Sequence, residues 1–213
     1  MNHYIITIFL SFILYVIFNW IHNQKTLYNL LLFLLALNLL SFNIYLIFNG
    51  VFNYQIHLPL HLCYLTEIGI LASILFHTKF YYPWLLLNGL GGGITGFLNS
   101  NLMGDAMLIE HIHLYLSHFN LLLFSLILYK ANFFISRSDF LKSIAFNLFL
   151  FISVIFFNIK FHSNYWFTSS KPPGMNLTSI LPEWPYYLLI LIGIGITSYY
   201  ITFKLFSKNF NIN

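Results

Sequence analysis

Long apolar runs separated by short polar stretches fill almost all of this 213-residue chain. In hydrocarbon every backbone amide must be bonded within its own segment, so such runs are predicted to be helices and not strands. A spanning helix needs about 20 mainly apolar residues. The pattern predicts an all-α, polytopic membrane helical bundle with about seven transmembrane helices, at residues 4–20, 28–48, 58–76, 80–98, 108–129, 139–157 and 185–206.

The composition supports a membrane protein, because only 7% of the residues are charged and 59% are hydrophobic. Ordinary soluble domains carry about 25% charged residues. We therefore expect residues 1–213 to form a single integral membrane domain. The net charge of +4 comes from scattered basic residues without a run or a stripe, so no nucleic-acid partner is expected.

The basic residues also predict the orientation, because they accumulate on the cytoplasmic side of membrane proteins. Seven of the nine fall on one side of the predicted bundle and two, Lys160 and Lys171, on the other. The N-terminus is therefore predicted to lie outside and the C-terminus in the cytoplasm. The seven residues are Lys25, Lys79, Lys130, Arg137, Lys142, Lys204 and Lys208.

The unusual polar segments all fall on the side with few basic residues. They are residues 55–63 before the third run, residues 105–113 before the fifth, and the connection at about 158–184. Such a long connection is typical of a lid or a binding loop. Its Pro and aromatic residues predict an ordered extracytoplasmic cap over a site at this end of the bundle.

Cys63 is the only cysteine and lies at the start of the third helix. The positive end of a helix dipole favours the thiolate, which is the reactive form. The alternative is that Cys63 is simply a small apolar residue in a packed helix. His61 precedes it by two residues, and Glu67 follows one turn later on the same face.

Glu67 is an ionisable residue inside a predicted spanning helix, which by default indicates a functional site. A protonated carboxyl group bonded to a neighbouring helix is the structural alternative. In the fifth helix, His111, Tyr115 and His118 follow at i, i+4 and i+7 and predict one stripe that faces the interior, while His113 points elsewhere. A thiol beside an imidazole that a third group orients would make a nucleophile and base pair.

Five glycines, from Gly89 to Gly96, fall inside the fourth run. In membranes small residues usually allow close helix contact. The functional alternative is an unwound segment that supplies backbone amides, or a groove for an acyl chain.

The motif Leu58-Pro59-Leu60-His61-Leu62-Cys63, the glycines, the His-rich fifth helix and the later Asn164-Tyr165, Lys171-Pro172-Pro173 and Trp184-Pro185 resemble the YwaF family of bacterial integral membrane proteins. The order of these motifs agrees with that family from about residue 50 to 200. The family is similar to the eukaryotic "transmembrane protein 164" acyltransferases.

This resemblance implies a transacylase in the bacterial plasma membrane that moves acyl chains between phospholipid and lysophospholipid. Cys63 would be the nucleophile and His118 the base, with His61, Glu67, His111 and Tyr115 in supporting roles. We expect Asn164, Tyr165, Lys171 and Trp184 to contact the substrate, with Lys171 on a lipid phosphate. No cofactor and no metal ion is expected.

Two other functions remain open. A metal-dependent lipid hydrolase could use the ligand types of Cys63, Glu67 and the histidines, although their spacing matches no known zinc motif. A transporter with a His and Glu site would need polar residues toward the cytoplasmic ends of the helices, where they are scarce.

Overall fold

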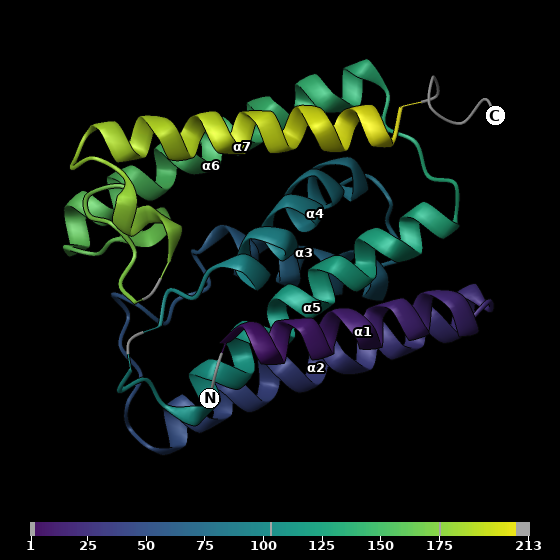
Figure 1. Cartoon of the computed structure of the whole chain (residues 1–213), viewed down its shortest axis with the longest axis horizontal. Coiled ribbons are helices and arrows are strands. Elements are labelled where there is room, and N and C mark those ends of the chain that lie inside the picture. Colours follow the sequence, from purple (N-terminus) through teal and green to yellow (C-terminus); the bar gives the residue numbers. More distant parts are fainter. Residues whose placement is uncertain (1–2, 103, 175, 208–213) are drawn as a thin grey trace.

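The computed structural model describes residues 3–102, 104–174 and 176–207 (Figure 1). These residues form seven α-helices and two 3₁₀ helices, without a strand among them, so the all-α prediction is confirmed. The helices are α1 (His3–Trp20), α2 (Gln24–Phe48), α3 (Leu62–Leu75), α4 (Tyr82–Leu98), α5 (Leu108–Lys130), α6 (Arg137–Phe161), η1 (Tyr165–Phe167), η2 (Leu177–Ile180) and α7 (Tyr186–Leu205).

Five of these helices, α1, α2, α5, α6 and α7, are long and apolar enough to cross a membrane. The outer ones bury little of their surface within the protein and expose large apolar side chains, such as Phe9 and Phe12 on α1 and Phe149 and Phe156 on α6. Apolar surface of this extent is stable only against hydrocarbon. The chain is therefore an integral membrane protein with a helical bundle.

Helix α4 lies at the centre of the bundle and contacts α1, α3, α5, α6 and α7. Three consecutive leucines near its start, Leu85, Leu86 and Leu87, are completely buried. In Figure 1, α1 and α2 form one outer layer, α6 and α7 form the other, and α3, α4 and α5 lie between them.

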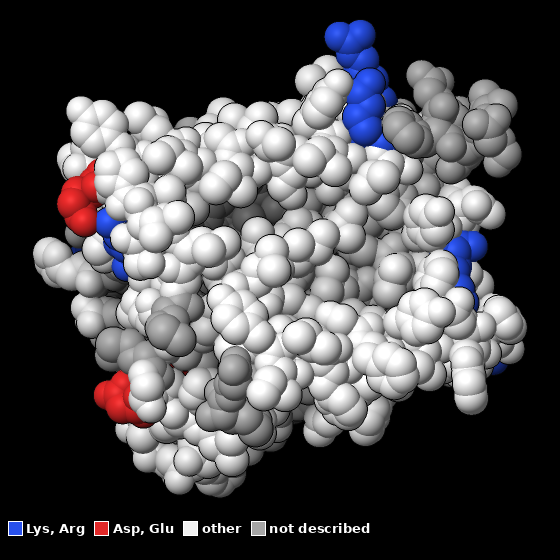
Figure 2. All heavy atoms as spheres, in the orientation of Figure 1, with Lys and Arg blue, Asp and Glu red and all other residues white. Residues whose placement is uncertain are grey.

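The three polar segments meet at one end of the bundle, as the sequence predicted. The backbone N–H of Leu58 donates to Tyr165 Oη at 2.9 Å, and Trp166 Nε1 donates to Leu60 O at 2.6 Å. His57 Nε2 lies 3.5 Å from Glu110 Oε1 in the first turn of α5. On the face that Figure 2 shows, acidic side chains gather at this end and most basic ones at the opposite end.

The third helix is shorter than the prediction of residues 58–76, because it begins at Leu62. Residues 58–61 instead form a tight turn in which the N–H of Leu60 donates to Leu58 O at 2.7 Å. The ring of a proline disfavours the helical conformation at the residue before it, and Leu58 precedes Pro59. Helix α3 therefore contains only 14 residues, with Cys63 in its first turn.

The sixth helix is longer than predicted and runs through Asn158 to Phe161. His162 follows in the left-handed conformation with φ of 52° and ends the helix. The connection predicted at about 158–184 is therefore the segment 162–185, which we call the cap. It contains η1 and η2.

Candidate active site

Cys63 is the second residue of α3, and its sulfur packs against α4 at a glycine. A Cβ atom added to Gly92 would lie 3.2 Å from Cys63 Sγ. Any side chain at position 92 would therefore press on the sulfur. Because Gly92 has no side chain, the thiol lies directly against the main chain of α4.

His118 comes from α5, is 8% exposed, and packs on the next turn of the same α4 face. A Cβ atom at Gly96 would lie only 2.2 Å from three atoms of the imidazole ring, so no residue other than glycine fits there without displacing the ring. The ring also interacts with the backbone of Gly92. Its Nδ1 atom is buried and has no hydrogen-bond partner in the part of the chain that the structure describes.

The Cys63 sulfur and the His118 ring therefore both contact a short glycine stripe on α4, formed by Gly92 and Gly96. The two glycines are four residues apart, which is one helical turn. Helix α4 is continuous from Tyr82 to Leu98, so the hypothesis of an unwound glycine segment is wrong. The glycines instead allow α3 and α5 to approach α4 closely, as small residues do in membrane bundles.

Glu67 is completely buried and lies at the centre of a hydrogen-bond network that joins three helices. Asn38 Nδ2 and Asn120 Nδ2 donate to Glu67 Oε1 at 2.8 and 2.9 Å. Ser117 Oγ donates to Oε2 at 2.5 Å. The carboxyl group thus binds α2 and α5 to α3 one turn below Cys63.

His113 extends this network, in agreement with the prediction that it points away from the stripe of His111, Tyr115 and His118. Its Nδ1 donates to Asn38 Oδ1 at 3.2 Å, and its ring stacks on Phe42 with 3.9 Å between centroids. His113 therefore anchors the outer end of α5 to α2.

His111 and Tyr115 stack with their ring centroids 6.5 Å apart, and Tyr115 contacts His3 in the first turn of α1. His3 Nδ1 lies 3.1 Å from Tyr115 Oη, and His3 Nε2 lies 3.1 Å from the carbonyl oxygen of Phe97. Through these two contacts His3 holds the start of α1 against α4 and α5.

His61 precedes α3 and turns its ring toward the cap. The ring meets Tyr165 edge to face at 4.9 Å and Phe167 at 5.3 Å. Burial lowers the pKa of His61 to about 4, so the ring is neutral near neutral pH. Tyr165 is completely buried, and its hydroxyl donates to Tyr54 O at 2.8 Å while it accepts from Leu58.

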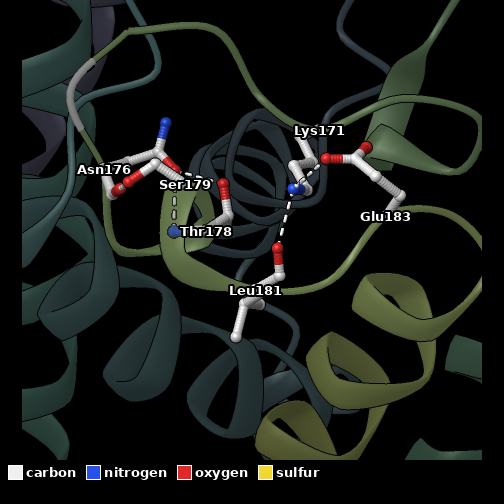
Figure 3. Close-up of polar contacts among 6 residues, drawn as sticks. All are labelled: Lys171, Asn176, Thr178, Ser179, Leu181 and Glu183. Carbon is white, nitrogen blue, oxygen red and sulfur yellow. Dashed lines mark hydrogen bonds and ion pairs between the residues drawn. The ribbon is translucent and has the colours of Figure 1, made fainter.

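The other cap residues named from the sequence brace the cap itself. Asn164 Nδ2 donates to the carbonyl oxygen of Ser170 at 2.8 Å, and Trp184 Nε1 donates to Thr168 O at 3.2 Å. Lys171 Nζ donates to Leu181 O and to the Glu183 carboxylate, both at 2.7 Å (Figure 3). These bonds fix the path of the cap over the end of the bundle.

Sequence reasoning missed four polar residues of this region: His3, Asn38, Ser117 and Asn120. A signal existed, because Asn38 and Asn120 stand within long apolar runs where an amide needs a partner. The pattern along one helix could not say which other helix supplies that partner.

Among residues 3–102, 104–174 and 176–207, no three His, Cys, Asp or Glu side chains lie close enough together to hold a metal ion. His61 turns toward the cap, and the bonds that Glu67 accepts come from amides and a hydroxyl. The metal-hydrolase alternative therefore has no set of ligands in these residues.

Comparison with known proteins gives one match, to the sequence model of the TMEM164 family, over residues 1–203. No curated protein and no solved structure matches the chain. The match covers all seven helices apart from the last residues of α7, and so includes the Cys63 and His118 positions.

Proposed function

The chain belongs to the TMEM164 family, and on this premise we propose that it is a membrane acyltransferase that moves a fatty acyl chain between phospholipids through a thioester on Cys63. In this proposal Cys63 is the nucleophile and His118 is the general base. The substrates are a phospholipid and a lysophospholipid of the surrounding bilayer, which we propose to be the bacterial plasma membrane.

The observation that carries this proposal is that the Cys63 sulfur and the His118 ring pack against Gly92 and Gly96, which are one turn apart on the same stripe of α4. A thiol within reach of an imidazole is the general arrangement of a Cys nucleophile and its base. The unpartnered Nδ1 of His118 also supports it, because a buried polar atom without a partner is costly and is found where chemistry needs it.

In the first half-reaction His118 takes the thiol proton, and the Cys63 sulfur attacks the ester carbonyl carbon of the donor phospholipid. The carbon–oxygen ester bond breaks, and the proton on His118 passes to the departing lysophospholipid oxygen. In the second half-reaction the hydroxyl of another lysophospholipid gives its proton to His118 and attacks the thioester. The carbon–sulfur bond breaks, and the thiol recovers the proton.

The negative charge on the carbonyl oxygen would be stabilised by backbone amides of the first turn of α3. The first four N–H groups of a helix have no partner within it. The residue before α3, His61, makes no side-chain hydrogen bond to them. Donors fixed in this way typically contribute a factor of about 10²–10³ to the rate of acyl transfer.

The test is to incubate the purified protein, in nanodiscs, with a phosphatidylcholine whose acyl chain carries an alkyne tag. Because the chain has one cysteine, a hydroxylamine-sensitive label on the protein must lie on Cys63. We expect the wild-type protein to become labelled and to pass the tag to added lysophospholipid, and Cys63→Ala to do neither. Transfer at the wild-type rate in Cys63→Ala would refute the nucleophile. Release of tagged fatty acid in place of a new phospholipid would identify a hydrolase.

The orientation of the bundle is part of the same proposal. The excess of basic residues at the end opposite the cap supports a cap that lies outside the cytoplasm. A reporter fused after α7 that is active only in the cytoplasm tests this. Activity only of a periplasmic reporter at that position would reverse the orientation.

A further inference from the structure

A long groove lies on the side of α4 that faces α7. It has a volume of about 540 Å³ and is lined mainly by aliphatic side chains and glycines of the two helices. Figure 2 shows the surface hollowed between α7 and α4. The volume lies in the range of about 300–1,000 Å³ that is usual for ligand pockets.

Gly193 on α7 lines this groove and is not needed for helix packing. A Cβ atom at Gly193 would meet nothing within 4 Å. By contrast, a Cβ at Gly91 on α4 would lie 2.0 Å from Ser198 Oγ, so Gly91 is where the helices touch. The missing side chain at Gly193 therefore keeps the groove open, and it is not what allows α4 and α7 to approach each other.

Two of the four residues with hydroxyl groups on the groove wall, Thr95 and Thr197, bond these groups within their own helices. Thr95 Oγ1 donates to the carbonyl oxygen of Gly91 at 2.9 Å, and Thr197 Oγ1 donates to that of Gly193 at 2.8 Å. These two threonines therefore present methyl groups to the groove, and with the aliphatic side chains and glycines they make most of the wall apolar, which suits an apolar ligand.

The dimensions favour an extended ligand. The lining residues of α7 run from Ile190 to Leu205, which at 1.5 Å per residue is about 22 Å. This is a large part of the roughly 30 Å thickness of a bilayer core. Because α7 is apolar and mostly exposed, the open side of the groove faces the lipid.

From these features we infer that the groove between α4 and α7 binds one acyl chain of a membrane phospholipid. This inference rests on the proposed function, for which it supplies the place where the substrate's chain lies. The opposite face of α4 carries Gly92 and Gly96, which contact Cys63 and His118. The groove is lined by Gly91, and the sulfur contacts the adjacent Gly92.

The cap closes the end of this helix pair. Asn99, at the end of α4, accepts the hydrogen bond from Leu177 at the start of η2. A lipid whose chain fills the groove and whose headgroup reaches the cap would bring its ester bond to the end of α4. Around that end the ester could reach the first turn of α3.

The experiment uses the full chain in nanodiscs of palmitoyl-oleoyl phosphatidylcholine that contain a phosphatidylcholine with a diazirine in its acyl chain. After illumination, cross-linked peptides are quantified by mass spectrometry. Gly193→Leu places a side chain in the groove, and Gly195→Leu is the matched control, because position 195 is also open within 4 Å but does not line the groove.

We expect Gly193→Leu to lower cross-linking to the groove residues of α4 and α7 by about tenfold, as a side chain that overlaps a ligand does. Gly195→Leu should match the wild-type protein. Equal cross-linking in Gly193→Leu and wild type, or labelling spread evenly over the exposed faces of α6 and α7, would overturn the inference.

The same samples separate this inference from the proposed function. Cross-linking needs no catalysis, so it should persist in Cys63→Ala. Groove-specific cross-linking without a thioester on Cys63 would support the groove and refute the acyltransferase. A thioester that forms equally fast in Gly193→Leu and Gly195→Leu would support the acyltransferase and refute the groove.

Discussion

Replacing Gly96 by alanine tests the role of His118 without changing any side chain that could do chemistry. The new methyl carbon would lie 2.2 Å from atoms of the His118 ring. Non-bonded carbon atoms need about 3.5 Å, so the ring must move by about 1.3 Å. Position 96 is buried against α5, which leaves outward movement of the ring as the main way to relieve the overlap.

The expected effect on the reaction is larger than the effect on stability. A misplacement of about 1 Å costs a catalytic group about 100-fold in rate. The overlap destabilises the fold by about 1–3 kcal/mol, but alanine regains about 1 kcal/mol over glycine in a helix. We therefore expect Gly96→Ala to fold, with a rate of Cys63 acylation about 100-fold below wild type.

The assay is the time course of hydroxylamine-sensitive labelling of Cys63 by the alkyne-tagged phospholipid. Melting in detergent reports on the fold of each variant. Gly195→Ala is the control, because it has the same gain in helix propensity and a Cβ that meets nothing within 4 Å. It should be labelled at the wild-type rate.

Labelling of folded Gly96→Ala at the wild-type rate would refute the reasoning. It would mean that the position of the His118 ring does not matter, and hence that His118 is not the base. His118→Gln should then also retain activity, which would direct attention to the other histidines at this end of the bundle.

Three further predictions concern the support of the site. Glu67→Ala should lower the melting temperature markedly, because three buried donors lose their acceptor at about 1–3 kcal/mol each. Replacement of the exposed Glu183 should leave the melting temperature unchanged, and equal melting of both variants would contradict the Glu67 network. Tyr165→Phe should speed hydrogen exchange at residues 54–61, since the Leu58 amide loses its partner, and unchanged protection would show that this bond is unimportant. The folded-state pKa of His61 is lowered from 6.5 to about 4, so the contribution of His61 to stability falls as the pH drops through that interval. The melting temperature of His61→Phe should therefore fall less on acidification than that of wild type. An equal fall in both proteins would contradict a buried, neutral His61.

The number and order of the helices could be predicted from the sequence, because hydrocarbon forces long apolar runs to form helices. The convergence of the polar segments at one end followed from the alternation of the helices. Pro59 could have placed Leu58 outside α3, but the start at Leu62 could not be predicted. Residues 58–61 also bond to Tyr165 and Trp166, which lie about 100 residues later in the chain.

The geometry around the candidate site residues could not be predicted from the sequence. Counting residues along α3 and α5 gives Cys63 and His118 different depths, which argues against their meeting. The count leaves out α4, against which the structure places the sulfur at Gly92 and the ring at Gly96, one turn apart. The hydrogen-bond partners of Glu67 could not be predicted either. Asn38 and Ser117 lie on other helices, and the pattern of residues along one helix does not show which helices pack beside it.

The shortness of α3 would link the proposed chemistry to the thickness of the bilayer. Its 14 residues extend about 21 Å, which is less than the roughly 30 Å hydrocarbon core, and Cys63 lies in its first turn. The height of the sulfur is fixed by the protein, whereas the height of the lipid ester is fixed by the membrane. A thicker bilayer lifts the esters away from the sulfur, and a thinner one brings them toward it, so hydrophobic mismatch would tune the rate of the proposed acyl transfer.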